Sequence, residues 1–494
     1  MEYVVGIDVG TTSVKATVLS KDCELVFEDQ IPHQLITQRA NFSEEDPNVW
    51  WDSTLTLLKR IVQELKDGLV AIGVSGMVPT LILVDEKGEP IRHSIQQNDA
   101  RAVEEIEYFK SKIDREEFFE RTGNTINQQL IFPKFEWLRR HEPENVQKTR
   151  WIMGSYNYIT FKLTGKPCLD VNWALESGMW DVKEKRWFDE ILKVAGIPKD
   201  LLAQVYEPHQ TVGELKAEIA EQIGIHHPVA VIAGSADHIA STLGIGAIRD
   251  GDLVLKIGGA GDVMYVSDEL IVDENLFIDY HDVPGKYVLN GCMAASGSIV
   301  RWFSEKILKT DLRSLNEQAK NSPVGSNSLI LLPYFLGEKT PIFDAKAKGV
   351  WLGLSLNHEI KDLFRSILEA VAYGFMHHIE VIRNKGRKIE RVFLCNGGAK
   401  SELWRKIVAD VTGYDLIYIE ENPGSSAGVA FLAGYAVGLF KDWEEIEKMN
   451  KRKYIVHCDA KNHELYSRYY KIYRETYESL KHVFEKLYEL SAGM

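Results

Sequence analysis

The sequence lacks the features that mark disulfide-rich, membrane-spanning and P-loop proteins. Its 494 residues include only five cysteines, scattered and without a CxxC pair, which argues against a disulfide framework or a zinc site. No run of about 18 apolar residues occurs, and no charged leader precedes an apolar stretch, so we expect neither a transmembrane helix nor a signal peptide. The GxxxxGK[ST] phosphate loop and the GxGxxG dinucleotide fingerprint are also missing.

Positive charge is scarce as well. The chain has 58 Lys and Arg against 72 Asp and Glu, which gives a net charge of −14. An acidic chain repels phosphate backbones and anionic lipid, so nucleic acid and membranes are not expected partners. Hydrophobic residues make up 45 % and charged residues 26 %, close to globular averages. We therefore expect a folded cytoplasmic protein of about two to four domains.

Two similar strand–glycine turn–strand patterns begin the two halves of the chain. The four predicted strands are 3–9 with 14–19, and 252–257 with 262–266. A helix predicted at 50–66 and a strand at 69–75 follow the first pattern, and this alternation is typical of an α/β sheet with covered faces. We predict two related domains, residues 1–245 and 246–494, with a C-terminal helix at 462–490 packed on the second.

The first candidate site is the segment Asp8-Val9-Gly10-Thr11-Thr12-Ser13-Val14-Lys15. Glycine lets the backbone approach an anion, and consecutive N–H groups and hydroxyls can line a phosphate, with Lys15 adding a positive charge. An aspartate beside such a turn is well placed to hold Mg²⁺, directly or through water. The alternative is a plain β-hairpin with a polar turn.

The second candidate site is Gly234-Ser235-Ala236-Asp237-His238, between a strand predicted at 228–233 and a helix predicted at 239–243. Strand-to-helix junctions are where α/β sheets present ligand-binding groups, and a carboxylate there can accept a hydroxyl proton. The alternative, that Asp237 merely caps the helix, stays open from these residues alone. We expect His238 to be a packed, hydrogen-bonded residue rather than a catalyst.

A third candidate is the Gly-Gly turn in Cys395-Asn396-Gly397-Gly398-Ala399-Lys400-Ser401. It lies between a predicted strand at 392–394 and a predicted helix at 402–411, where it permits a nucleobase or sugar to approach the backbone. A fourth segment, 424–430, is a run of small residues that favours close helix packing.

Together these segments resemble the FGGY family of carbohydrate kinases, within the actin/hexokinase/Hsp70 superfamily. The resemblance extends to about Phe440, and the ordered matches are GIDVGTTSVK at 6–15, EDPNVWW at 45–51, NDAR at 98–101, LTG at 163–165, GSADH at 234–238, MAASGSIVRWF at 293–303, LPYFLGEKTP at 332–341, AKGVWLGL at 347–354 and NGGAKS at 396–401. It implies two ribonuclease-H-like (actin-like ATPase) domains with an interdomain cleft, sugar mainly on the first domain and nucleotide mainly on the second. Family members are often dimers or tetramers, so a homodimer is an expectation.

The resemblance also implies roles for individual residues. Asp8 is associated with Mg²⁺, and Asp237 is the general base. The phosphates of ATP would meet a first loop of Gly10, Thr11, Thr12, Ser13 and Lys15, a second loop with Gly258 and Gly259, and backbone at Gly297, Gly397 and Gly398. The sugar would lie near Val78, Pro79, Asn98, Asp99 and Arg101, with Arg101 orienting Asp99. From the residues alone, Asn98-Asp99 is equally a solvated turn.

Two departures from the family pattern bear on the substrate and the nucleotide. The second phosphate loop has Gly259-Ala260 where relatives carry hydroxyls, and Met77-Val78-Pro79 replaces the Gln-Met-His typical of xylulose kinases. We expect ATP-dependent phosphorylation of a primary hydroxyl of a small sugar or polyol, with a ketopentose such as xylulose first. The alternatives are a gluconate, hexulose or polyol kinase of the same family, or a catalytically weak nucleotide-dependent sugar-binding protein.

Overall fold

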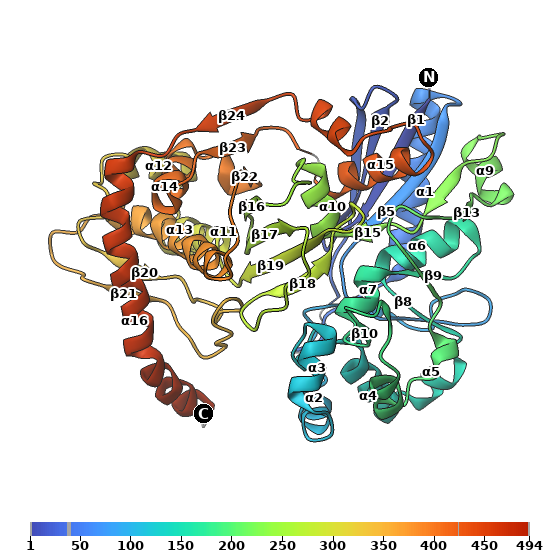
Figure 1. Ribbon diagram of the computed structural model, residues 1–494, viewed down its shortest axis with the longest axis horizontal. Helices are drawn as coiled ribbons and strands as arrows, with labels where there is room; N and C mark the ends of the chain where they lie inside the picture. Colours follow the sequence, from blue (N-terminus) through green and yellow to red (C-terminus); the bar gives the residue numbers. More distant parts are fainter. Residues whose placement is uncertain (1, 37–40, 423, 493–494) are drawn as a thin grey trace. The chain divides into compact units, whose positions relative to one another are not determined.

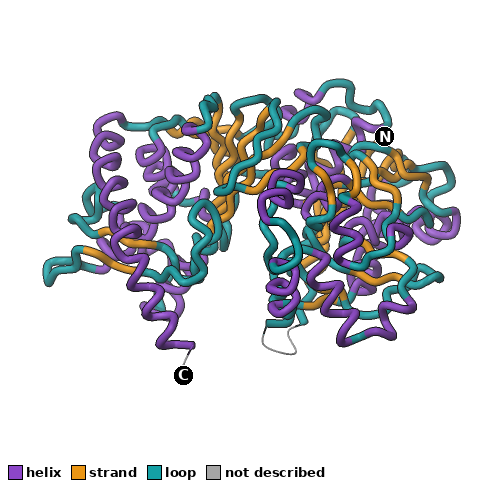
Figure 2. Tube along the Cα trace, turned by 60° about the horizontal axis from the view of Figure 1, so that its bottom comes forward, coloured by secondary structure: helices purple, strands orange, loops and turns teal. Residues whose placement is uncertain are grey.

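A computed structural model describes residues 2–36, 41–422 and 424–492, which form two compact units. Unit 1 comprises Met1–Ile248, Ile278–Tyr287 and Asn422–Lys451, and unit 2 comprises Arg249–Phe277, Val288–Glu421 and Arg452–Met494. Each unit is a mixed sheet with helices, which confirms the predicted pair of α/β bodies (Figures 1 and 2). The single boundary at 245–246 stays a prediction, because the chain returns to unit 1 twice after residue 248.

The sheet of unit 1 has the strand order β13-β14-β5-β1-β2-β3, with β15 also paired to β5. The strands are β1 (Tyr3–Val9), β2 (Ser13–Ser20), β3 (Leu25–Pro32), β5 (Leu69–Gly76), β13 (Thr211–Glu214), β14 (Ala230–Ile232) and β15 (Ser235–Ala236). The predicted β1–β2 hairpin is confirmed, with β3 next to it. Strands β1, β14 and β15 each pair with β5 in parallel, so the carboxyl ends of β1, β5 and β15 lie at one edge.

Three helices of unit 1 pack on this sheet or on each other: α1 (Pro47–Leu65), α10 (Asp237–Gly244) and α15 (Ser425–Ala436). Small residues let α15 approach both β1 and α10 closely. A Cβ added to Gly6 would lie 1.9 Å from the carbonyl oxygen of Ser426, and one on Gly428 would lie 1.8 Å from that of Ala240. The close packing predicted for segment 424–430 is therefore confirmed, and it joins α15 to the first part of the chain.

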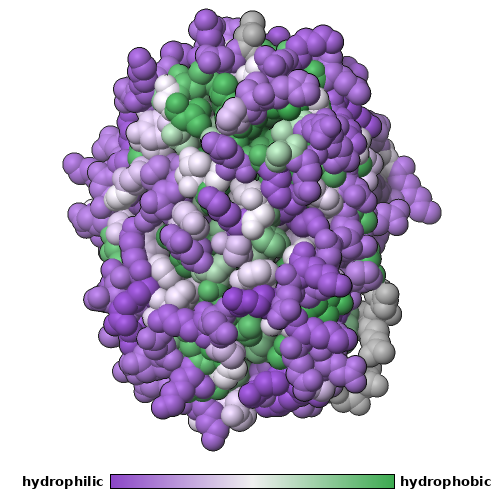
Figure 3. All heavy atoms as spheres, turned by 90° about the vertical axis from the view of Figure 1, so that its right-hand side faces the viewer, coloured by the Kyte–Doolittle hydropathy of each residue, from purple (hydrophilic) through white to green (hydrophobic). Residues whose placement is uncertain are grey.

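The remaining elements of unit 1 are mostly short. They are β4 (Glu44–Glu45), β6 (Ile82–Val84), β7 (Ser94–Ile95), α2 (Val103–Lys110), α3 (Arg115–Thr122), α4 (Ile131–His141), α5 (Pro143–Lys148), β8 (Trp151–Met153), α6 (Ser155–Thr164), β9 (Cys168–Asp170), α7 (Val171–Glu176), β10 (Trp180–Asp181), β11 (Arg186–Trp187), α8 (Asp189–Ala195), η1 (Lys199–Leu201), β12 (Gln204–Tyr206), α9 (Ala217–Ile223) and η4 (Trp443–Lys448). The face in Figure 3 is largely hydrophilic, with smaller hydrophobic areas scattered over it.

The second sheet has the order β18-β19-β17-β16-β22-β23-β24. Its strands are β16 (Asp252–Ile257), β17 (Gly261–Ser267), β18 (Phe277–Tyr280), β19 (Tyr287–Met293), β22 (Arg391–Cys395), β23 (Leu416–Ile419) and β24 (Lys453–Val456). The strands predicted at 252–257 and 262–266 are confirmed as β16 and β17. Strand β16 pairs in parallel with β22, so the glycine segments that follow these two strands lie at the same edge.

Helices and a hairpin complete unit 2. They are α11 (Gly297–Arg301), η2 (Trp302–Leu308), α12 (Leu312–Ala319), β20 (Ile330–Leu332), β21 (Val350–Leu352), α13 (Ile360–Asn384), η3 (Gly397–Lys400), α14 (Glu402–Thr412) and α16 (Ala460–Ala492). The predicted C-terminal helix packs on this unit, where the hydroxyl of Tyr466 donates to Glu369 at 2.7 Å. Within the described part of the chain, no helix combines the length and apolar character needed to cross a membrane.

Candidate active site

Two of the predicted site carboxylates meet at the sheet edge of unit 1. Asp8 lies near the end of β1, opposite Ser75 of the parallel strand β5, and Ser75 in turn pairs with Ser235 of β15. The hydroxyl of Ser75 donates to Oδ1 of Asp8 at 2.9 Å. Asp237 follows β15 directly, so three neighbouring strand ends bring Asp8 and Asp237 to one place.

The charge of Asp237 acts on the carboxyl group of Asp8. Burial and, to a smaller extent, the negative charge of Asp237 raise the pKa of Asp8 to about 6, although the hydroxyls of Ser425 and Ser75 and the charge of Lys15 act in the opposite direction. Two carboxylates and nearby hydroxyls form a set of hard oxygen donors, the kind that Mg²⁺ prefers. The residues present therefore fit a magnesium ion at Asp8.

Asp237 is the first residue of α10 and keeps part of its side chain open. The residue before it, Ala236, is the N-cap and makes no side-chain capping bond. Oδ1 of Asp237 accepts the N–H of His238 at 2.6 Å, and 38 % of the side chain is exposed. This geometry favours an accessible base over a helix cap, and the N-terminus of a helix favours a negative charge there.

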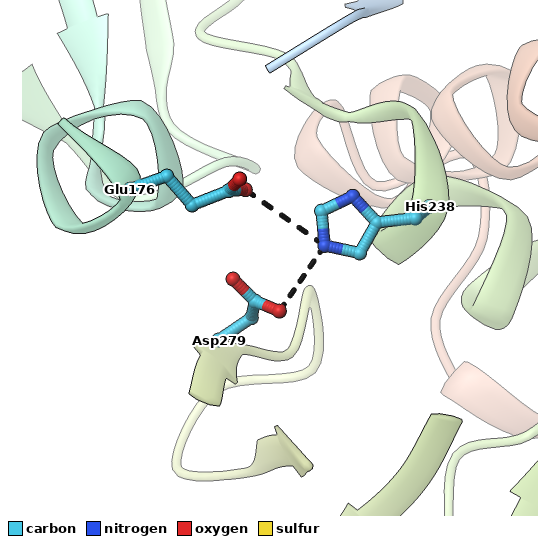
Figure 4. A group of neighbouring side chains, drawn as sticks. All are labelled: Glu176, His238 and Asp279. Atoms are coloured by element: carbon cyan, nitrogen blue, oxygen red, sulfur yellow. Dashed lines mark hydrogen bonds and ion pairs between the residues drawn. The ribbon is translucent and has the colours of Figure 1, made fainter. Parts of the chain in front are cut away.

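A histidine and two more acids lie beside Asp237, and Figure 4 shows them. Nε2 of His238 lies 3.2 Å from Oδ2 of Asp279 on β18 and 3.8 Å from Oε1 of Glu176 on α7. The ligand atoms of the three side chains lie within 4.8 Å of one another, a set that can also bind a metal ion. In the described structure, however, Nε2 and Asp279 already satisfy each other directly.

Further buried acids surround this cluster. Burial raises the pKa of Asp170 to about 6 and that of Asp282 to about 7. Asp282 accepts the hydroxyl of Ser235 at 2.7 Å, and Asp170 accepts the N–H groups of α7. No sequence pattern pointed to Glu176, Asp170, Asp279 and Asp282, because they come from separate short elements; only His238, next to Asp237, carried a signal.

The predicted first phosphate loop is the turn between β1 and β2. The N–H of Gly10 donates to the carbonyl of Ser13 at 3.1 Å, which closes the turn and leaves Thr11 and Thr12 exposed at its tip. Lys15 on β2 pairs with Glu28 at 2.9 Å. Exposed N–H and hydroxyl groups at the tip are available to an anion, and the role of Gly10–Lys15 stays a prediction.

The predicted nucleotide glycines lie together in unit 2. The N–H of Gly297 donates to the carbonyl of Gly258 at 2.8 Å, and the N–H of Ser296 donates to that of Gly259 at 2.9 Å. A Cβ on Gly297 would lie 2.5 Å from the Gly258 oxygen, and one on Gly398 would lie 2.2 Å from Ile257. The backbone there tolerates no side chain at either position.

Gly397 begins the short η3 segment and has open space around it, since a Cβ added there would have no atom within 4 Å. The glycine segments that follow β16 and β22 thus lie side by side, and their contact with a nucleotide stays a prediction.

The predicted sugar-side residues divide into exposed and buried ones. Val78 and Pro79 are buried, and the flanking Met77 and Thr80 are held by Ser155, whose hydroxyl donates to the Met77 carbonyl at 2.9 Å. Asn98 is exposed and free to meet a ligand.

The side chains of Asp99 and Arg101 are fully buried and form an ion pair with each other. Arg101 donates to Oδ1 of Asp99 through Nε at 2.8 Å and to Oδ2 at 2.7 Å, and Asp99 also accepts the N–H of Ser43. The guanidinium lies 3.9 Å from the ring of Phe42 and 4.9 Å from that of Trp137. Arg101 does orient Asp99, but these contacts serve the fold, so a direct sugar contact by Asp99 stays a prediction.

Comparison with protein families matches both parts of the chain. Residues 3–244 match the N-terminal domain, and residues 256–437 the C-terminal domain, of the FGGY family of carbohydrate kinases.

Individual relatives cover nearly the whole chain. It is 28 % identical over 490 residues to a xylulose kinase of Staphylococcus xylosus, with 97 % of this chain and 100 % of that protein covered. It is 25 % identical to a gluconokinase of Bacillus subtilis, with 90 % of each covered. Its structure is similar to that of a xylulose kinase from Rhodospirillum rubrum, with a TM-score of 0.92, 36 % identity, and coverage of 98 % of this chain and 100 % of that one.

Proposed function

The chain belongs to the FGGY family of carbohydrate kinases, and from that membership we propose that it transfers the γ-phosphoryl group of ATP to a primary hydroxyl of a small sugar. A ketopentose such as xylulose is the leading substrate, because relatives named xylulose kinase cover 97–98 % of the chain. The observation that carries the proposal is the pair of Asp8 and Asp237 at one sheet edge of unit 1.

Asp237 would act as the general base. Its exposed carboxylate takes the proton of the sugar hydroxyl, the resulting oxygen forms a bond to the γ-phosphorus, and the bond from that phosphorus to the ADP oxygen breaks. The hydroxyls of buried Ser75 and half-buried Ser425 hydrogen-bond Asp8 and hold it at this edge. Asp8 would hold Mg²⁺, which when bound neutralises charge on the phosphates.

Each of the two glycine turns would bind phosphate through its own backbone groups. The Gly10–Ser13 turn offers exposed N–H groups and the hydroxyls of Thr11 and Thr12. The second loop has no hydroxyl at Gly259 or Ala260, so these two residues offer a phosphate only their backbone N–H groups. Positioning and electrostatics rather than covalent chemistry then supply the rate.

A gluconate kinase is the second candidate, because a gluconokinase also matches over 90 % of the chain. Val78-Pro79 is buried and carries no side-chain donor, so the hydroxyl pattern that this protein recognises differs from that of relatives with a histidine there. A cytoplasmic location and a homodimer remain part of the proposal.

A coupled assay of ADP release with a panel of sugars tests the proposal. With Mg²⁺ and ATP, one sugar of the panel, xylulose first and gluconate second, should raise the rate by at least about 10²-fold over the sugar-free rate. Removing Mg²⁺ with a chelator should abolish this increase. Nucleotide binding without any sugar-dependent release would instead show a binding protein and refute the proposed reaction.

A further inference from the structure

One oxygen of Asp237 is held from two sides by its neighbour in the chain. Oδ1 accepts the backbone N–H of His238 at 2.6 Å, and Nδ1 of the same histidine lies 3.5 Å from it. Both contacts fall on Oδ1. A carboxylate whose one oxygen is fixed presents the other in a defined direction, which is what a base needs to meet a hydroxyl proton.

The imidazole is itself held on its far side. Nε2 lies 3.2 Å from Oδ2 of Asp279 and 3.8 Å from Oε1 of Glu176, and Figure 4 shows both interactions meeting on this one nitrogen. His238 comes from α10, Asp279 from β18 and Glu176 from α7. Asp279 thus hydrogen-bonds the ring on its far side, Glu176 lies close to the same nitrogen, and only 17 % of the histidine side chain is exposed.

The charges around the ring favour its doubly protonated form. Burial lowers the pKa of His238, but the charge of Asp279, the bond to Asp237 and the charge of Glu176 outweigh it and raise the pKa well above its usual value. An imidazolium carries N–H groups on both nitrogens, one for Asp279 and one for Asp237.

We propose that His238 is a positioning residue for phosphoryl transfer: held by Asp279 and Glu176, its ring fixes Oδ1 of Asp237 and leaves Oδ2 to receive the proton of the substrate hydroxyl. This inference rests on the proposed function, since it assigns a task to the neighbour of the proposed base. Asp279 and Glu176 act through the histidine and need not touch the substrate. As in a catalytic triad, a buried acid, Asp279, orients a histidine. Here the histidine in turn orients Asp237, the proposed base.

Two substitutions at His238 separate positioning from packing. His238→Phe keeps the ring volume and removes both donors, and we expect kcat to fall about 10–100-fold while KM for sugar and ATP changes by less than about threefold. His238→Asn keeps a donor close to the Nδ1 position and should recover most of kcat. His227→Phe is the matched control: His227 lies 2.8 Å from the exposed Asp67, and its loss should leave kcat unchanged.

A double-mutant cycle makes the test specific. In an Asp237→Asn background, His238→Phe should lower kcat no further, because the ring acts through Asp237. A further loss in that background, or a rise in sugar KM with kcat unchanged, would show that His238 contacts substrate and would overturn the proposal. Equal losses in His238→Phe and His238→Asn with a lower melting temperature would show a structural role instead.

Two other outcomes are distinguishable. In one of them, a chelator lowers the wild-type kcat although Mg²⁺ is in excess, and added zinc restores it. This result would show that Glu176, His238 and Asp279 hold a metal, and it would overturn the positioning role. If wild type shows no sugar-dependent ADP release, the proposed function and this inference both fail. If wild type is active and His238→Phe keeps full kcat, only the inference fails.

Discussion

Replacing Arg101 with methionine should destabilise unit 1 strongly. The side chains of Arg101 and Asp99 are 0 % exposed and lie 2.7 Å apart. Methionine keeps the apolar stem between Phe42 and Trp137 but leaves the carboxylate of Asp99 buried without its partner. Breaking a buried ion pair by removing one member typically costs about 3–5 kcal/mol, because the remaining charge has lost both water and its counter-charge.

The size of the expected shift follows from the size of the unit. Unit 1 spans 288 residues, just above the 150–250 residues for which each 1 kcal/mol lowers the melting temperature by roughly 2–4 °C, so the lower value applies. Arg101→Met should therefore lower it by roughly 6–10 °C. The guanidinium also loses its contact with Glu44 at 2.6 Å, so the upper part of that range is the better expectation.

Thermal unfolding followed by circular dichroism measures the effect, and Arg60→Met is the matched control. Arg60 pairs with Asp29 at the same 2.7 Å, but the two side chains are 49 % and 31 % exposed. An exposed pair contributes about 0–1 kcal/mol, so this control should melt close to wild type. Adding Asp99→Asn to Arg101→Met should recover part of the loss, because the buried charge is gone.

Equal melting temperatures for Arg101→Met and Arg60→Met would refute this reasoning. An unchanged melting temperature of Arg101→Met together with a large rise in its KM for sugar would also refute the reasoning. It would mean that Asp99 and Arg101 serve the sugar, as the sequence resemblance implied, rather than the fold.

Two more predictions concern packing and pH. Gly428→Ala should lower stability by about 1–3 kcal/mol in chemical denaturation, because its Cβ would lie 1.8 Å from the Ala240 carbonyl, whereas Gly397→Ala, with no atom nearby, should not. Burial raises the pKa of Asp282 from 3.8 to about 7. The stability that its protonated carboxyl contributes to the folded state is therefore fully present below pH 4 and is lost as pH rises through 7. Asp282→Asn should therefore gain up to about 4 kcal/mol over wild type at pH 8 and nothing at pH 4; an equal difference at both values would contradict the assignment.

Local patterns predicted the strands and helices well, because those signals are local. The glycine-bounded apolar runs at 252–257 and 262–266 became β16 and β17. The base candidate Asp237 came from the junction between a strand predicted at 228–233 and a helix predicted at 239–243, which the structure has as β14 and α10. The surroundings of Asp237 were not predictable this way. Glu176 and Asp279 lie about 60 and 40 residues from His238 along the chain, and only the folded sheet edge brings them together.

For other segments the sequence left the answer open, and only burial in the folded structure decided it. Asn98-Asp99-Ala100-Arg101 looks equally like a polar turn or a sugar site in sequence, and only the packing of Phe42 and Trp137 around Arg101 shows where its charge lies. Segment 424–430 likewise predicted a helix but not its neighbours. Contact between α15 and the first sheet joins residues more than 400 positions apart, as in the hydrogen bond between the Thr17 and Ser426 hydroxyls at 2.7 Å.

The most direct test of the account is the turnover of Asp237→Asn with the sugar that the panel identifies. Asparagine keeps the shape of the side chain and cannot take a proton, so kcat should fall about 10²–10⁴-fold while the dissociation constant of Mg·ATP, measured by calorimetry, stays within about twofold. The exposed Asp67→Asn serves as the control and should turn over like wild type. Wild-type kcat in Asp237→Asn would contradict the central claim.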